Sequence, residues 1–293
     1  MRILLLGGNG QVGTELQRSL APLGEVLVGT RDGRLADGTP CERADFDAPD
    51  ALRPLLSRVA PDVVVNAAAY TQVDKAEQER AAAWRANAEA PGVLAGACAQ
   101  QGATLVHYST DYVFDGSGTR PYREDDPTAP LGAYGASKLA GERAIGDSGA
   151  HHLVFRTAWV YAAHGRNFLR TMLRLAAERD ELRVVADQVG SPTPAAVIAD
   201  VTAQVLAQAP TQSGLWHLTT TGHTSWHGFA EAIMACAHAR GLVARPPRVV
   251  PIATSEYPTP AARPAYSVLD CSKLQQDFGI ALPTWRQGLD QTL

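Results

Sequence analysis

Short apolar runs alternate with amphipathic stretches along the first half of the chain. The runs at 2–6, 25–32, 61–69 and 103–109 predict buried strands. Between them, apolar residues recur at helical spacing, as in Val12, Leu16 and Leu20. Parallel strands are joined by crossover helices, so this order predicts a doubly wound parallel sheet of the Rossmann type.

The second half continues the alternation with shorter elements and more proline. We expect a dinucleotide-binding Rossmann domain of residues 1–160 plus a returning segment 193–221. Residues 161–192 plus 222–293 are expected to form a smaller C-terminal α/β substrate domain, since proline-rich loops suit a lid-like unit. The expected elements are a helix from Tyr134, strands at 151–161, 182–193 and 214–219, and helices at 167–181, 195–208 and 226–240.

Glycines follow the first strand at once and lead into a helical pattern. Gly7, Gly10 and Gly13 form G-x-x-G-x-x-G, which leaves room for a pyrophosphate to approach backbone amides at a helix N-terminus. The pattern is weak alone, but its place between strand and helix is the confirming context. It predicts a dinucleotide site, with a plain glycine turn as the alternative.

The end of the second strand is where the adenosine ribose of such a cofactor is expected. Arg31 suits the 2′-phosphate of NADPH, whereas Asp32 suits a free ribose hydroxyl of NADH. We expect NADPH to be preferred and NADH tolerated; alternatively, Arg31 is only a solvated surface residue. Asp45 is a candidate contact for the adenine amino group, and Asp47 or Asp50 is expected to cap the next helix.

Proton chemistry is concentrated after the fourth strand. Thr110 ends that strand, and Tyr134 and Lys138 follow at a spacing that places both on one helix face. A nearby ammonium favours the phenolate, so a lowered pKa is expected for Tyr134. Such a tyrosine can exchange a proton with a reacting oxygen. Asn66 and the alanines after it end the third strand, where small residues let a cofactor lie flat.

Composition narrows the classes of function. The chain has 293 residues, 45% hydrophobic and 19% charged, with a formal net charge of −4 and no basic run. This argues against a nucleic-acid surface or a polybasic membrane anchor. The apolar start is too short for a signal peptide, and no run approaches the ~20 residues that span a bilayer. The four cysteines are dispersed, without C-x-x-C, which predicts reduced thiols in a cytoplasmic protein.

Taken together, these motifs resemble the extended short-chain dehydrogenase/reductase superfamily and, more narrowly, the dTDP-4-dehydrorhamnose reductase family. The resemblance covers nearly the whole chain, in family order. The matching segments are Gly10–Leu16, Asn66–Glu77, Tyr108–Gly116, Tyr134–Glu142, Arg156–Tyr161, Asp187–Thr193 and Arg263–Asp270.

The resemblance implies NADPH- or NADH-dependent reduction of the C4 keto group of dTDP-4-dehydro-β-L-rhamnose. The product, dTDP-β-L-rhamnose, is a sugar donor for cell-surface polysaccharide. Tyr134 would be the general acid, Lys138 would hold the nicotinamide ribose and lower the phenol pKa, and Thr110 would hydrogen-bond the C4 oxygen. Further candidate cofactor contacts are Gly7, Asn9, Gly10, Gln11, Val12, Gly13, Arg31, Asp45, Phe46, Asn66, Ala67, Ala68 and Ala69.

For the sugar nucleotide, Trp159 is expected to pack against the deoxysugar, with a core tryptophan as the alternative. Arg263 is expected at the diphosphate because a guanidinium fork matches it, with a solvated loop arginine as the alternative. The remaining candidate substrate contacts are Val73, Asp74, Lys75, Thr110, Asp111, Tyr134 and Asn167.

Three questions stay open at this stage. Some members of the family form a dimer through Mg²⁺ bound partly by a glutamate matching Glu15, but its partner ligands are not matched here; Glu15 also suits the first turn of a helix. An epimerase or dehydratase of the same superfamily is an alternative, although Tyr112 stands where a dehydratase is expected to have an acid. A non-catalytic Rossmann subunit resembling the partner of methionine adenosyltransferase is the third reading.

Overall fold

A seven-stranded parallel sheet forms the centre of the protein, whose computed structural model describes all 293 residues. The strand order is β11-β6-β5-β4-β1-β2-β3, and every pairing is parallel. The doubly wound sheet predicted from the sequence is therefore confirmed. The strands are β1 (Arg2–Leu6), β2 (Glu25–Thr30), β3 (Glu42–Arg43), β4 (Val63–Asn66), β5 (Thr104–Thr110), β6 (His152–Thr157) and β11 (Gly214–His217).

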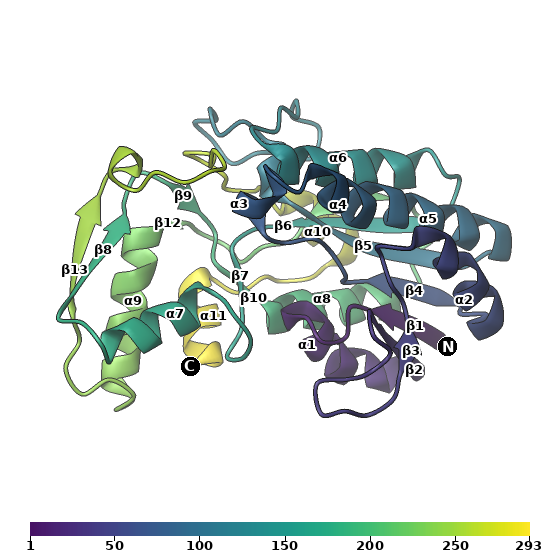
Figure 1. Ribbon diagram of the computed structural model, residues 1–293, viewed down its shortest axis with the longest axis horizontal. Coiled ribbons are helices and arrows are strands. Elements are labelled where there is room, and N and C mark those ends of the chain that lie inside the picture. The colour runs from purple at the N-terminus through teal and green to yellow at the C-terminus, as the bar shows by residue number, and fades with distance from the viewer.

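Helices cover both faces of this sheet (Figure 1). α1 (Gln11–Leu20) and α8 (Ala195–Ala207) pack together on one face, and α2 (Leu52–Val59), α5 (Ala90–Gln101) and α6 (Ala133–Gly146) cover the other. Successive side chains of a strand point to opposite faces. Consequently Ile3 and Leu5 belong to one hydrophobic core, and Leu4 and Leu6 to the other.

The segment between β4 and β5 is divided into several short helical pieces. It contains α3 (Val73–Ala76), α4 (Arg80–Trp84) and a π-helical turn, η3 (Arg85–Glu89), ahead of α5. Asn87 lies in that turn, where its amide Oδ1 accepts from the Tyr70 N–H at 2.8 Å and its Nδ2 donates to the Tyr70 carbonyl at 3.0 Å. The interruption thus fixes the loop that follows β4.

A smaller body lies beside the sheet, on the left of Figure 1. Its core gathers apolar side chains from α7, α9, α11 and β8 around Phe229. α10 (Ser272–Phe278) instead contributes Leu274 and Phe278 to the core beneath the main sheet. The elements of the smaller body are α7 (Phe168–Ala176), α9 (Trp226–Ala239), α11 (Trp285–Thr292), β8 (Glu181–Val185) paired with β13 (Arg248–Ile252), β9 (Val189–Gly190) with β12 (Thr224–Ser225), and β7 (Val160–Tyr161) with β10 (Thr193–Pro194).

Several predicted boundaries were wrong because pairing between distant segments decides them. The strand expected at 151–161 ends at Thr157, and the strand expected at 182–193 is divided into β8, β9 and β10. The segment after β2 ends in β3, a short strand that no apolar run predicts and that pairs with β2. The remaining elements are four single 3-10 turns: η1 (Ala21–Leu23), η2 (Pro49–Ala51), η4 (Asp111–Val113) and η5 (Thr254–Glu256).

All four cysteines are free thiols, as expected. None of the helices combines the length and the apolar character needed to cross a membrane.

Candidate active site

The glycine loop lies directly against the end of β4. Gly7 has φ +84°, and a Cβ at this position would stand 2.6 Å from the Ala68 nitrogen. A Cβ at Gly13 would stand 2.1 Å from the Gly7 carbonyl oxygen. Hydrogen is thus the only side chain that fits at either position. The loop ends at the N-terminus of α1, so the structure has the cradle that a pyrophosphate needs.

Arg31 and Asp32, the two residues expected to determine the preference for NADPH or NADH, lie in different environments at the end of β2. The Arg31 side chain is 73% exposed, and its Nη2 lies 3.9 Å from an Asp47 carboxylate oxygen. Asp32 accepts a hydrogen bond from the Thr30 hydroxyl at 3.1 Å, which lowers the pKa of its carboxyl group. Arg31 is therefore exposed at this strand end and available to an anionic group.

The neighbouring adenosine candidates are held by local contacts. Asn9 donates through Nδ2 to the Arg34 carbonyl at 3.0 Å, which ties the glycine loop to the loop after β2. Asp45 accepts from the Asp47 N–H at 3.1 Å, and Phe46 is buried in the core. Their contacts with a cofactor remain predictions.

A buried chain of polar groups joins β4 to α6. Asn66 Oδ1 accepts from the Ala68 N–H at 3.1 Å, and Asn66 Nδ2 lies 3.0 Å from His107 Nδ1. His107 Nε2 lies 3.2 Å from Lys138 Nζ, which also donates to the Tyr108 carbonyl at 2.6 Å. The pairing of β4 with β5 places Asn66 beside His107. His107 was not among the residues predicted for the site, although a polar side chain within an otherwise apolar strand could have indicated it.

Thr110, Asp111 and Tyr134 form a buried cluster of two hydroxyl groups and a carboxyl group. The Thr110 hydroxyl donates to Asp111 Oδ1 at 3.1 Å, while Asp111 Oδ2 is buried without a partner. Burial raises the pKa of Asp111 to about 6. Burial also raises the pKa of Tyr134 to about 12, opposed by a hydrogen bond from Thr110.

The lowered pKa expected for Tyr134 was therefore wrong. Helical spacing indicated that Lys138 would favour the phenolate, but in the folded protein loss of solvent is the largest effect on the phenol, and the negative charge of Asp111 raises its pKa further. Lys138 Nζ is engaged with Tyr108 and His107 in this structure. Tyr134 consequently keeps its proton at neutral pH, the state that a general acid requires.

Two residues from the segment after β4, Glu77 and Asn87, hold the start of α6, where Tyr134 lies. Glu77 Oε1 accepts from the Ala133 N–H at 2.7 Å. Asn87 Nδ2 donates to the Ser137 hydroxyl at 3.0 Å, which links α6 to η3. These contacts fix the helix, and therefore the phenol, relative to the loop after β4.

A buried ion pair lies one turn beyond Lys138. Arg156 donates from Nε and Nη2 to the two oxygens of Glu142, at 2.9 and 2.7 Å. Burial lowers the pKa of Lys138 to about 8, and the negative charge of Glu142 opposes that shift. In its buried position, the ammonium form of Lys138 is therefore only weakly favoured over the neutral amine at neutral pH.

Two candidate substrate residues bind each other. Arg263 Nη1 and Nη2 lie 3.1 and 2.8 Å from the two carboxylate oxygens of Asp74, and this contact lowers the pKa of Asp74. Val73 begins α3 beside this pair, and Lys75 is exposed. The ion pair joins α3 to the C-terminal loop, so both predicted residues lie at one junction between the two bodies.

Trp159 adopts an unusual backbone conformation, with φ +48°. Its ring stacks on Trp226 at a centroid distance of 3.5 Å and an interplanar angle of 4°. The backbone of Gly190 also approaches closely, because a Cβ there would lie 2.5 Å from Trp159 Cε2. One ring face is therefore covered by Trp226, and contact of the ring with a sugar remains a prediction.

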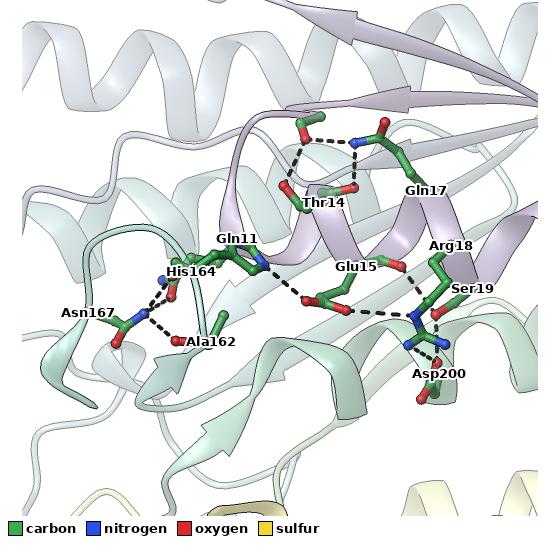
Figure 2. A network of polar contacts seen from close by, with 12 residues as sticks. Gln11, Thr14, Glu15, Gln17, Arg18, Ser19, Ala162, His164, Asn167 and Asp200 are labelled. Atoms are coloured by element: carbon green, nitrogen blue, oxygen red, sulfur yellow. Dashed lines mark hydrogen bonds and ion pairs between the residues drawn. The ribbon is translucent and has the colours of Figure 1, made fainter. Parts of the chain in front are cut away.

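Figure 2 shows a polar network between α1 and the loop before α7. Asn167 Nδ2 lies 2.7 Å from Gln11 Oε1, and Asn167 Oδ1 caps α7 by accepting from the Arg170 N–H. Glu15 Oε1 lies 2.9 Å from His164 Nε2. The helix that starts at the glycine loop is thus linked directly to the smaller body.

This network also bears on the proposed metal ligand. Glu15 bonds to His164, and Arg18 Nε lies 3.8 Å from its other oxygen. No group of three or more His, Cys, Asp or Glu side chains is placed to hold a metal ion. The contacts of Glu15 here are therefore those of a link between elements of one chain.

Comparison with known proteins gives consistent matches over the full length. The sequence profile of the RmlD substrate binding domain matches residues 1–293. The dTDP-4-dehydrorhamnose reductase of Burkholderia thailandensis is 54% identical over 297 residues, covering 98% of this chain and 96% of that protein. The crystal structure of dTDP-4-dehydrorhamnose reductase from Bacillus anthracis in complex with NADP has a TM-score of 0.90 at 34% identity, covering 99% of this chain and 98% of that chain. The dTDP-4-dehydrorhamnose reductase structure from Clostridium acetobutylicum has a TM-score of 0.90 at 37% identity, covering 100% and 98%.

Proposed function

The chain belongs to the dTDP-4-dehydrorhamnose reductase family, a family of NAD(P)H-dependent oxidoreductases, and we propose that it reduces the C4 keto group of dTDP-4-dehydro-β-L-rhamnose to give dTDP-β-L-rhamnose. One observation carries the proposal. Thr110, Tyr134 and Lys138 meet beside the glycine loop, where β1, β4 and β5 end. The carboxyl ends of parallel strands are where ligands bind in this kind of sheet.

The residues present fit a nicotinamide dinucleotide. Because Gly7 and Gly13 lack a Cβ, the glycine loop packs tightly against the end of β4 and against itself, and its backbone leads directly into the N-terminus of α1. In this proposal the glycine loop holds the pyrophosphate, Lys138 holds the nicotinamide ribose, and Arg31 favours NADPH while NADH is tolerated. The bound cofactor supplies the hydride that the reduction needs.

The chain's own residues handle the charge that develops on the C4 oxygen. Tyr134 donates its proton to that oxygen, which neutralises it. The Thr110 hydroxyl hydrogen-bonds the same oxygen, and a donor fixed in advance stabilises the charge without rearranging solvent. The Lys138 ammonium compensates the phenolate left on Tyr134.

The junction between the two bodies is the proposed place of the sugar nucleotide. Arg263 would transfer part of its hydrogen bonding from Asp74 to the diphosphate, since its planar fork matches both anions. Trp159 would contribute the free part of its ring to the deoxysugar. The division into a Rossmann and a substrate domain and the cytoplasmic location remain predictions, and a homodimer bridged by Mg²⁺ remains the alternative left open by the sequence. Val73, Lys75, Asp111 and Asn167 complete the proposed contacts.

A direct assay tests this function. Enzymatically prepared dTDP-4-keto-6-deoxy-L-sugar is mixed with the protein and NADPH or NADH, and nicotinamide oxidation is followed. We expect oxidation that depends on the sugar nucleotide. Absence of oxidation with both cofactors would refute the proposal, and conversion of the substrate without cofactor oxidation would favour an epimerase of the same superfamily.

A further inference from the structure

The hydrogen bonds around His107 determine which ring nitrogen carries its proton. Asn66 is oriented by the Ala68 N–H, which its Oδ1 accepts, so the Asn66 amide presents its NH₂ group to His107 Nδ1 at 3.0 Å. An amide NH₂ only donates, so Nδ1 must accept. His107 is 1% exposed, and burial together with the charge of Lys138 holds its pKa well below the usual value. The ring is therefore neutral, and its single N–H is on Nε2.

That N–H points at the amino group of Lys138. His107 Nε2 lies 3.2 Å from Lys138 Nζ, and Nζ also donates to the Tyr108 carbonyl at 2.6 Å. An ammonium has three donors and no acceptor, whereas a neutral amine has one lone pair that can accept. The His107 N–H therefore opposes the ammonium and favours the amine.

The other charged and titratable groups around Lys138 do not cancel this effect. On α6, Glu142 favours the ammonium, but Glu142 is already bound through both oxygens to Arg156 on β6. Tyr134, one turn earlier on the same helix, keeps its proton and is neutral. His107, on β5, is the neighbour whose hydrogen-bonding direction depends on its tautomer.

We propose that His107 is a positioning residue of the reductase site: its Nε2–H tautomer, selected by Asn66, directs an N–H at Lys138 Nζ and so controls the protonation of that lysine. The functional part of this inference rests on the proposed reduction, in which the Lys138 ammonium compensates the Tyr134 phenolate. His107 itself does not touch the substrate in this account. It acts through Lys138, and links it to the strand end at Asn66.

The tautomer is measured directly and without any turnover. Two-bond ¹H–¹⁵N correlation spectra of the ¹⁵N-histidine protein distinguish Nε2–H, Nδ1–H and imidazolium rings, and the His107 signal is the one missing from His107→Gln. We expect a neutral Nε2–H ring across neutral pH. An Nδ1–H ring or an imidazolium in the unmodified protein would overturn the proposal.

Asn66→Asp tests whether the asparagine selects the tautomer. The aspartate has the same shape but presents an acceptor to His107 Nδ1, so the proton is expected to move to Nδ1 and leave Nε2 as an acceptor for Lys138. A ring that keeps its Nε2–H form in this variant would contradict the role assigned to Asn66. If His107→Gln fails to fold, the His107 ring is assigned instead by through-bond correlation to its own backbone in the ¹³C,¹⁵N-labelled protein.

The effect on Lys138 is read from the pH dependence of kcat/KM. In His107→Gln the amide oxygen can accept from Lys138, so the alkaline limb is expected to move upward by about one pH unit. His152→Gln, at the first residue of β6, where the ring bonds the Ala150 carbonyl instead of Lys138, is the matched control and should leave the limb in place. A limb that is unmoved or shifted downward in His107→Gln would overturn the proposal. Absent turnover in the unmodified protein would instead refute the reductase function, while the tautomer result would stand.

Discussion

Alanine at Gly7 is expected to damage the cofactor cradle, and a second glycine provides its control. Gly7 has φ +84°, and its added Cβ would lie 2.6 to 2.8 Å from backbone atoms of Ala67 and Ala68. Gly102, after α5, has φ +69°, but a Cβ there meets nothing within 4 Å. The two substitutions share the cost of a left-handed backbone and differ in the close contact.

The magnitude follows from these two contributions. Left-handed backbone costs an alanine about 1–2 kcal/mol, which is the whole effect expected on the free energy of unfolding in Gly102→Ala. Overpacking against backbone that cannot swing away adds about 1–3 kcal/mol in Gly7→Ala. Relief of that contact moves the end of β4 away from the loop, so we expect cofactor affinity to fall by at least about tenfold, or about 1.4 kcal/mol.

Urea unfolding of both variants measures the free energy of unfolding, and titration of each folded protein with NADPH measures the cofactor affinity. Gly102→Ala should bind the cofactor as the unmodified protein does. Equal destabilisation in the two variants, with NADPH affinity unchanged in Gly7→Ala, would refute the assignment of this loop as a cradle.

Other parts of the site give further predictions. Tyr134→Phe should lower turnover by about 10²–10⁴-fold while the thermal unfolding midpoint stays close to that of the unmodified protein, and near-normal turnover would remove Tyr134 from its role. Asn167→Ala removes both the cap of α7 and the Nδ2 donor to Gln11 and to the carbonyls of Ala162 and His164, whereas Asn167→Ser loses the same donor but keeps a capping oxygen. Asn167→Ala should therefore unfold with a free energy about 1 kcal/mol below that of Asn167→Ser, and urea unfolding that fails to separate the two would contradict this. Burial raises the pKa of Asp111 from 3.8 to about 6, so the folded protein binds the extra proton and the Asp111 contribution to stability falls as pH rises through that window. Asp111→Asn should therefore gain stability relative to the unmodified protein between pH 4 and 6, and a constant difference across urea titrations in that window would exclude the effect.

Much of the Rossmann half could be predicted because its signals are local. The apolar runs of β1, β4 and β5 are bounded by glycine or polar residues, and their strands were predicted to within a few residues. The strands β7, β9, β10 and β12 have two residues each, too few to carry a periodic pattern. They exist because segments far apart in the chain meet and pair.

The same distinction applies to the site. The glycine loop and the Tyr134–Lys138 pair are short motifs, whose spacing within one helix or turn already places their groups together. Asp74 and Arg263 are 189 residues apart in the sequence, so no local pattern predicts that two hydrogen bonds join their side chains. Their contact depends on how the smaller body lies against the sheet.

Residue order along the chain was enough to predict the parallel sheet and to nominate the glycine loop and the proposed proton donor, since hydrophobic period and side-chain spacing act within one element. The state of that donor was decided by the tertiary structure: burial, which no spacing contains, raises the pKa of Tyr134 instead of lowering it. The tertiary structure also decided the partner of Lys138, because His107 lies beside it only once β5 has paired with β4 and α6 has packed on the sheet. Desolvation and hydrogen-bond direction are properties of the assembled neighbours, and they exist only once the chain has folded.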